Sequence, residues 1–413
     1  MFLPEFSLPV RIPLRFFRTA PWWLALSALL LLTLDADQWQ QRFAPPMLAI
    51  THLLALGFLG NIMLGALLQV SAVLTGVRAK HAPFWGMALW LVLQLGTAML
   101  ALGLWQMQPV LLQAAAAILF CGLISLALWL LHRFWRSGTR SVLSWPVIGL
   151  GLTAVSGTLL VGILSYGFPA IGLNEILRAH IVLASITWLI ALIIAVAFTV
   201  VPMFLVAPAW PQALNRWLLP ALLLCALAAV MDARGLTILC LPILAWLFGL
   251  LRLLQNSQRR ADPARYLWGW GAVNMALVLA LLPWLVDVSD TASILMAGHF
   301  VLAGVLPIIT AMLAKIIPFL LWLDYRLQVP SGGKLRHMGQ LFPERWLKRL
   351  AYLSIAMGIT FWPLFQLTFK AIPIIILLYA GAIAYCLRRS VQTQQVAIVQ
   401  AKTLSAQTSN QPK

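Results

Sequence analysis

Twelve apolar stretches divide this chain and constrain its fold more than any other feature. A membrane-spanning helix needs about 20 mostly apolar residues. The stretches are too long and too uniformly apolar for the alternating pattern of an outer-membrane β-barrel. The sequence therefore predicts an all-α, polytopic membrane bundle of about twelve transmembrane helices. The expected spans are 20–35, 45–77, 83–104, 109–132, 142–165, 176–206, 217–231, 235–254, 266–286, 291–323, 348–368 and 371–389.

Composition excludes the other broad classes of protein. The chain is 62% hydrophobic and only 9% charged, whereas soluble proteins have about 45–50% apolar and about 25% charged residues. A chain this apolar is neither a soluble domain nor a disordered one, and its net charge of +18 does not make it a nucleic-acid-binding protein. We expect a cytoplasmic segment at 1–19, a single transmembrane domain at 20–389, and a polar, Gln-rich, disordered cytoplasmic tail at 390–413.

The basic residues predict the orientation. With the N-terminus in the cytoplasm, 23 of the 28 Lys and Arg residues fall on the inner side and six of the ten acidic residues on the outer side. This is the positive-inside pattern of membrane proteins. An even number of spans returns the C-terminus to the cytoplasm. We therefore expect a multi-pass protein of a bacterial-type cytoplasmic (inner) membrane with both termini inside, and the charge indicates no partner beyond the lipid bilayer.

Three of the six histidines form a repeat. His52, His180 and His299 lie inside the second, sixth and tenth apolar spans, so each is four spans after the one before, at offsets of 128 and 119 residues. All three spans run from outside to inside, so the histidines lie at similar depth. The other three fall in expected cytoplasmic loops, where we expect them to be solvated: His81, His132 and His337. The spacing predicts a pseudo-threefold bundle of three sets of four helices.

The three intramembrane histidines predict a cofactor site. A polar side chain in hydrocarbon is costly and normally faces a partner inside the bundle. For one histidine, a hydrogen bond to a neighbouring helix is the simplest interpretation. Three in equivalent positions point instead to haem, because neutral imidazole is an axial ligand of haem iron and facing helices can supply two of them. We expect His52, His299 and His180 to be haem-iron ligands in a haem b site, and we assign no catalytic residue.

These features resemble subunit I of the haem–copper oxidases, and more closely the divergent NnrS-like proteins. Besides the three histidines, the resemblance rests on LGALLQV at 64–70, VVPMF at 200–204 and KIIPFLLW at 315–322. It implies a twelve-helix bundle of three four-helix arcs. It also implies that His52 and His299 are the axial pair of the low-spin haem, with His180 nearest the copper site. His180 could instead replace one member of the pair or hold a second haem alone.

The sequence departs from the oxidases at the copper site. Span seven of the oxidases holds two copper-binding histidines, but here it reads RWLLPALLLCALAAVMD from Arg216. Span ten of the oxidases has two histidines separated by one residue, but here the positions two before and two after His299 are Ala297 and Val301. One imidazole cannot hold a catalytic metal without other donors. We therefore expect no copper and no oxygen reduction, and the enzyme class stays open beyond that.

The resemblance implies a link to nitric oxide response or to respiratory metal and haem homeostasis, with respiratory or denitrification proteins as partners. A twelve-span secondary transporter is the first alternative, although transporters usually have two six-helix halves. An accessory or assembly factor of a respiratory complex is the second. Lys315, inside span ten, has two interpretations: a lysine that snorkels to the cytoplasmic interface, or a partner for a carboxylate or a haem propionate. Arg178 and Glu175 are further candidates for a propionate partner.

Overall fold

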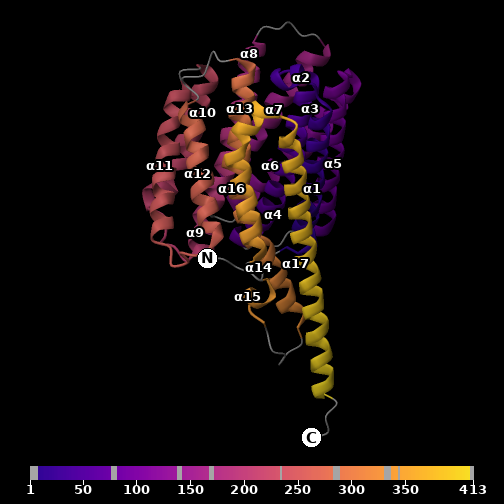
Figure 1. Ribbon diagram of the computed structural model, residues 1–413, viewed down its shortest axis with the longest axis vertical. Coiled ribbons are helices and arrows are strands. Elements are labelled where there is room, and N and C mark those ends of the chain that lie inside the picture. Colours follow the sequence, from indigo (N-terminus) through magenta and orange to yellow (C-terminus); the bar gives the residue numbers. More distant parts are fainter. Residues whose placement is uncertain are drawn as a thin grey trace.

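The computed structural model describes residues 8–75, 81–136, 142–166, 172–232, 235–281, 289–329, 336–342 and 345–409. Its described elements are all helices (Figure 1). The elements are α1 Arg11–Thr33, α2 Ala36–Gln40, α3 Pro45–His52, η2 Leu53–Gly60, α4 Asn61–Thr75, α5 Ala82–Gln106, α6 Pro109–Arg136, α7 Ser144–Tyr166, α8 Leu173–Val182, η3 Leu183–Ile190, α9 Ala191–Leu205, α10 Gln212–Met231, α11 Gly235–Gln255, α12 Pro263–Leu281, α13 Asp290–His299, η5 Phe300–Val305, α14 Leu306–Gln328, α15 Met338–Leu341, α16 Arg345–Leu367 and α17 Ala371–Ser409.

The chain is a multi-pass membrane protein. Within the described residues, eleven helices are long and apolar enough to cross a membrane, and each coincides with one of the twelve expected spans. The remaining expected span, 266–286, is represented by α12, a helix of 19 residues. Residues 282–288 of that region lie outside the described residues.

Three spans form the interior of the bundle, and they are the three that carry the intramembrane histidines. In their most apolar windows, 83% of residues are buried in Pro45–Val73, 78% in Leu173–Leu205 and 89% in Asp290–Gln328. The corresponding values for the other eight spans are 28–44%. Those eight present much of their apolar surface outward, as helices facing lipid do. The histidine-bearing spans are therefore central and the others surround them.

Each central span changes its helical winding next to its histidine. The α-helical first part ends at or just after the histidine, and a π-helical segment follows: η2 after His52, η3 from the third residue after His180, and η5 after His299. π-Helical turns are rare and occur frequently at functional sites. The repeat seen in the histidines is therefore also a repeat in backbone geometry.

The helix that precedes each central span packs closely against its π-helical segment. The three pairs are α1 with η2, α7 with η3, and α12 with η5. Glycines permit this approach. A methyl group at Gly149 of α7 would overlap the carbonyl oxygen of Thr187 in η3, and one at Gly271 of α12 would lie 2.5 Å from the carbonyl oxygen of Gly304 in η5.

The polar tail departs from its prediction over most of its length. We predict disorder at 390–413, but α17 continues to Ser409 and extends beyond the bundle beside the end of α14 and α15 (Figure 1). Gln394 donates hydrogen bonds to the carbonyl oxygen of Leu321 and to Asp324, and Ile398 packs in a small apolar cluster with Tyr325. These tertiary contacts compensate for the low hydrophobicity of the segment. Residues 410–413 lie outside the described residues.

Candidate cofactor site at the central histidines

His52, His180 and His299 share a position in their spans. Each lies at or near the end of the short helix that opens its span: α3, α8 or α13. The starts of these helices follow from local sequence. Pro45 occupies the first turn of α3, which suits a proline because that position needs no N–H donor. Ser289 caps α13 by accepting a hydrogen bond from the Ala292 N–H.

The structure brings two of the three histidines together. The rings of His52 and His180 have their centroids 6.3 Å apart and an interplanar angle of 18°. Both side chains are half-buried. They come from adjacent central spans, 128 positions apart in the sequence. The nearly parallel rings therefore result from the packing of the spans and not from local sequence.

The hydrogen bonds of His52 determine which of its ring nitrogens carries a proton. Its Nδ1 lies 2.8 Å from the carbonyl oxygen of Leu48, one turn earlier in α3. A carbonyl oxygen can only accept, so Nδ1 is the protonated nitrogen and donates. The lone pair of a neutral imidazole then resides on Nε2. No hydrogen bond to Nε2 of His52 occurs within the described part of the chain.

His180 has the same arrangement through a different partner. Its Nδ1 lies 3.2 Å from Oγ of Ser156 on α7. The Ser156 hydroxyl donates its only proton to the carbonyl oxygen of Thr153, at 3.0 Å. Ser156 therefore accepts from His180 Nδ1, and the lone pair of His180 also resides on Nε2. This Nδ1–H contact is the one that orients histidine ligands in metal sites.

Gly157 makes room for the His180 ring on α7. A methyl group at this position would lie 3.0 Å from Cε1 and 3.4 Å from Nδ1 of His180. Every other residue type would press on the imidazole. The ring is thus held between a glycine that lets it lie against α7 and a serine that fixes its orientation.

The donor set, two neutral imidazoles, suits a haem iron. A bond of about 2.0–2.1 Å joins imidazole nitrogen to a metal such as zinc. With about 1 Å more from each nitrogen to its ring centre, the centroids of two imidazoles that bind one iron from opposite sides lie roughly 6 Å apart. The observed 6.3 Å belongs to a stacked arrangement, and offset aromatic pairs have the same separation. Each imidazole lone pair lies in the plane of its ring, so the two rings would have to turn edge to edge to share one iron. No group of three or more His, Cys, Asp or Glu side chains that could hold a bare metal ion is found in the described ranges.

His299 lies in a different environment. Its Nε2 lies 2.9 Å from the amide oxygen of Asn274 on α12, and its Nδ1 accepts a hydrogen bond of 3.0 Å from the Trp362 indole on α16. Both ring nitrogens are engaged, and no ring contact joins His299 to His52 or His180. The pair that the structure places face to face is therefore His52 with His180, one of the alternatives left open by the sequence, and not His52 with His299.

The charged candidates Arg178 and Lys315 have partners other than the histidines. Arg178 donates from Nε and Nη2 to the carbonyl oxygen of Val230, at 3.1 and 3.0 Å, and so caps the end of α10. Lys315 is 7% exposed and forms an ion pair with Asp262, which is 5% exposed and lies in the connection before α12. Of its two interpretations, the structure shows the carboxylate partner.

Sequence reasoning missed the residues that orient the histidines. Asn274 is an uncharged polar residue inside an apolar run, and that signal could have marked it as the partner of a buried group. Ser156 and Trp362 carry no such signal, because hydroxyl and indole side chains are common in membrane helices. Asp262 was overlooked because it lies in the connection before α12.

No family model matches the chain, and no curated protein is similar to it.

Proposed function

We propose that this chain is a haem-binding integral membrane protein in which His52 and His180 are the axial ligands of one haem b. The observation that carries the proposal is the pair of nearly parallel imidazoles at 6.3 Å, each hydrogen-bonded to the protein through Nδ1 and with no hydrogen bond to Nε2 within the part of the chain that the structure describes. Two imidazoles with oriented rings and available lone pairs are the donor set of a six-coordinate haem iron.

The protein's part in this site is to hold the ligands. Leu48 and Ser156 fix the protonated nitrogen of each ring, and Gly157 lets His180 lie against α7. A haem held by His52 and His180 would supply one-electron transfer. The absence of the oxidase copper histidines from span seven further favours electron transfer, or a role in nitric oxide response or respiratory homeostasis, over oxygen reduction.

The proposal extends to the architecture. Three contacts between helices agree with three sets of four: α6 packs on α7 and α11 on α12, which are consecutive in the chain, and α17 packs on α1, which is distant in the sequence. Each joins the last helix of one set to the first of the next. With α12 as the ninth span, the bundle has twelve helices in the arrangement of the haem–copper oxidases and NnrS-like proteins. This order also disfavours a transporter with two six-helix halves. The basic residues place both termini in the cytoplasm of a bacterial-type inner membrane, beside respiratory or denitrification partners.

Haem content of the purified chain tests the proposal. We expect the full-length protein, produced with haem available and purified in detergent, to give a pyridine haemochrome of haem b at one haem per chain and a low-spin spectrum. His52→Ala and His180→Ala should retain less than a tenth of that haem. His132→Ala is the matched control, because His132 is exposed on α6.

Two results would overturn the assignment. Equal haem content in the wild type, His52→Ala and His180→Ala would show that the two rings only pack against each other and do not bind haem. Loss of haem in His299→Ala but not in His180→Ala would restore the pair His52 and His299.

A further inference from the structure

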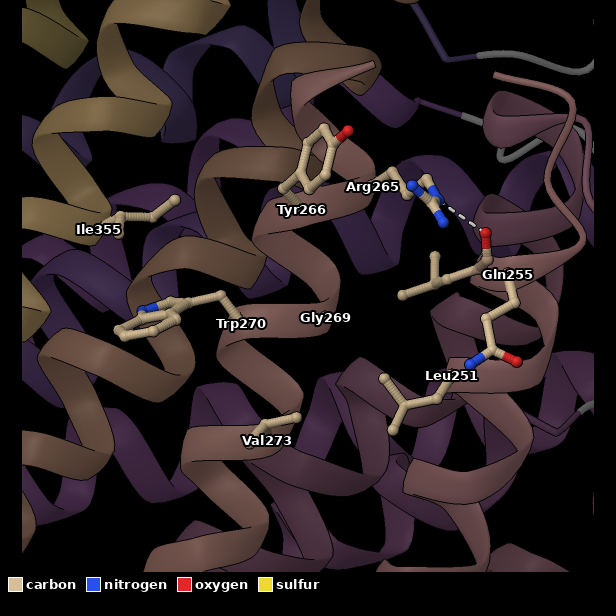
Figure 2. Close-up of a pocket in the computed structure, with 9 residues that line it drawn as sticks. Leu251, Gln255, Arg265, Tyr266, Gly269, Trp270, Val273 and Ile355 are labelled. Carbon is tan, nitrogen blue, oxygen red and sulfur yellow. Dashed lines mark hydrogen bonds between the residues drawn. The ribbon is translucent and has the colours of Figure 1, made fainter. Parts of the chain in front are cut away.

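A groove separate from the histidines lies between α11, α12 and α16. It encloses about 480 Å³. Figure 2 shows that its labelled side chains come from α11 and α12 and, across the groove, from Ile355 of α16. Most of the surface is apolar, contributed by Leu251, Leu254, Gly269, Trp270, Val273 and Ile355.

The lining is polar at one end only. Gln255, Arg265 and Tyr266 lie at the ends of α11 and α12 that the connection 256–262 joins. Leu251 and Val273 lie one to two turns further along the two helices, toward the middle of the membrane. The groove therefore runs from a polar rim at the inner side of the bundle to an apolar interior, which is the polarity profile of a phospholipid.

Arg265 supplies a fixed cation at the rim. Its Nε donates to the carbonyl oxygen of Leu254 at 2.7 Å (Figure 2), and its Nη1 to that of Arg260 at 3.4 Å. These contacts hold the guanidinium in place without neutralising it, because both partners are neutral carbonyls. Among the described residues Arg265 has no carboxylate partner.

The surroundings of Arg265 add positive charge. Arg259 and Arg260 are exposed in the same connection. The acid of that connection, Asp262, is buried in its ion pair with Lys315 and so cannot compensate the three arginines. Basic pockets between transmembrane helices at the cytoplasmic side are binding sites for anionic lipid head groups.

Gly269 opens the middle of the groove. The nearest atom to a methyl group at this position would be Cδ1 of Leu254 at 3.6 Å, an ordinary van der Waals distance. The backbone here does not require glycine for close helix packing, in contrast to Gly149 and Gly271. The missing side chain instead leaves volume that an acyl chain can occupy.

We propose that this groove binds one anionic phospholipid, with the phosphate at Arg265 and an acyl chain along Leu254, Gly269 and Val273. Charge complementarity at the rim selects the anionic head group, and apolar burial retains the chain. The lipid joins α16 to the α11–α12 hairpin at the inner side of the bundle. This proposal does not depend on haem binding.

Native mass spectrometry of the full chain in detergent tests the proposal, with phosphatidylglycerol and phosphatidylcholine of identical acyl chains as probes. We expect the wild type to bind one phosphatidylglycerol at least tenfold more tightly than phosphatidylcholine. Arg265→Gln should lose this preference, and Arg265→Lys should keep part of it because the charge remains. Gly269→Leu should weaken both lipids at least tenfold by filling the groove.

Two control variants make the same kinds of substitution outside the groove. Arg216→Gln removes an exposed arginine at the start of α10, and Gly381→Leu adds the same side chain where no atom lies within 4 Å of a new methyl group. Both should bind lipid like the wild type. Circular dichroism checks that each variant is folded, and Arg265→Lys together with Gly269→Leu tests the site if Arg265→Gln is unfolded.

The proposal fails if the wild type binds the two lipids equally, or if Gly269→Leu binds both as the wild type does. A quinone that co-purifies with the wild type and is lost in Gly269→Leu, with lipid binding unchanged, would assign the groove to a quinone instead.

Discussion

His299 and Asn274 form a hydrogen bond of 2.9 Å between Nε2 of the imidazole and Oδ1 of the amide. Because Trp362 donates to the opposite ring nitrogen, the only lone pair of a neutral His299 is already in use. His299 thus has the contacts of a histidine that ties three helices together, while His52 and His180 are each hydrogen-bonded through Nδ1 alone among the described residues. Three histidines in equivalent sequence positions therefore differ in the chemistry available to them.

The difference predicts that His299 is replaceable. In His299→Gln, we expect the haem content to stay within about 20% of the wild type, because glutamine can still bond to Asn274 and neither ligand is touched. His52→Gln should lose haem. The loss of the Trp362 hydrogen bond should lower the stability of His299→Gln by about 1–3 kcal/mol. Pyridine haemochrome and thermal unfolding in detergent measure the two effects, and a haem loss in His299→Gln equal to that in His52→Gln would contradict this prediction.

The orientation of His180 should depend on Ser156. Ser156→Ala removes the acceptor of the Nδ1–H bond, and loss of such an orienting partner lowers metal affinity about 10–100-fold. We expect Ser156→Ala to bind haem about 10–100-fold more weakly than the wild type, measured by the transfer of haem from each protein to apomyoglobin. Thr158→Ala is the control, because the Thr158 hydroxyl bonds only to its own helix at Ala154. Equal haem retention in Ser156→Ala and Thr158→Ala would show that Ser156 does not orient His180.

An imidazole in solution should replace the His180 side chain. In His180→Gly, as in His180→Ala, we expect less than a tenth of the haem to remain, and because this fraction is held by His52 alone it should be high-spin and should bind carbon monoxide, unlike the wild type. Added imidazole should restore the low-spin spectrum. Absorption spectra over an imidazole titration measure the effect. The prediction would be wrong if His180→Gly stayed low-spin without imidazole.

Removing one partner of the Lys315–Asp262 ion pair should destabilise the protein, because the other charge is then buried without a partner. Both side chains are buried, so Lys315→Met leaves a buried carboxylate alone, which costs about 3–5 kcal/mol. The double variant Lys315→Met/Asp262→Asn should recover most of the loss. Asparagine still accepts the hydrogen bond that the Ala264 N–H gives to Asp262. Thermal unfolding of the two variants measures the effect. An equal loss of stability in the single and the double variant would contradict the prediction.

The close approach of α7 to η3 should tolerate no side chain at Gly149. We expect Gly149→Ala to lower the free energy of unfolding by about 1–3 kcal/mol, the usual cost of overpacking, and to shift the His180 environment, because the new methyl group collides with Thr187. Gly381→Ala, in the exposed part of α17 where no atom lies within 4 Å, should be neutral or slightly stabilising. Unfolding midpoints in the same detergent compare the two, and no difference between them would contradict the observed packing.

The sequence predicted the multi-pass class and eleven of the span positions because hydrophobic length is a local property. It also singled out His52, His180 and His299, since a polar residue inside an apolar run is visible without a structure. It failed at the tail, where Gln394 and Ile398 look solvated until their contacts with α14 are known.

Which histidines face each other is a different kind of property. His52 and His180 meet across 128 positions of sequence, and the choice between His180 and His299 as its partner depends on how three central helices are rotated about their axes. Each rotation is set by a π-helical segment and by glycines such as Gly149 that admit a neighbouring backbone. The sequence by itself thus determined the bilayer-spanning helices and the three imidazoles within them. Only the tertiary structure decided that His299 is bound by Asn274 and Trp362 while two lone pairs remain available, because hydrogen-bond partners are selected by packing between helices that are distant in the chain.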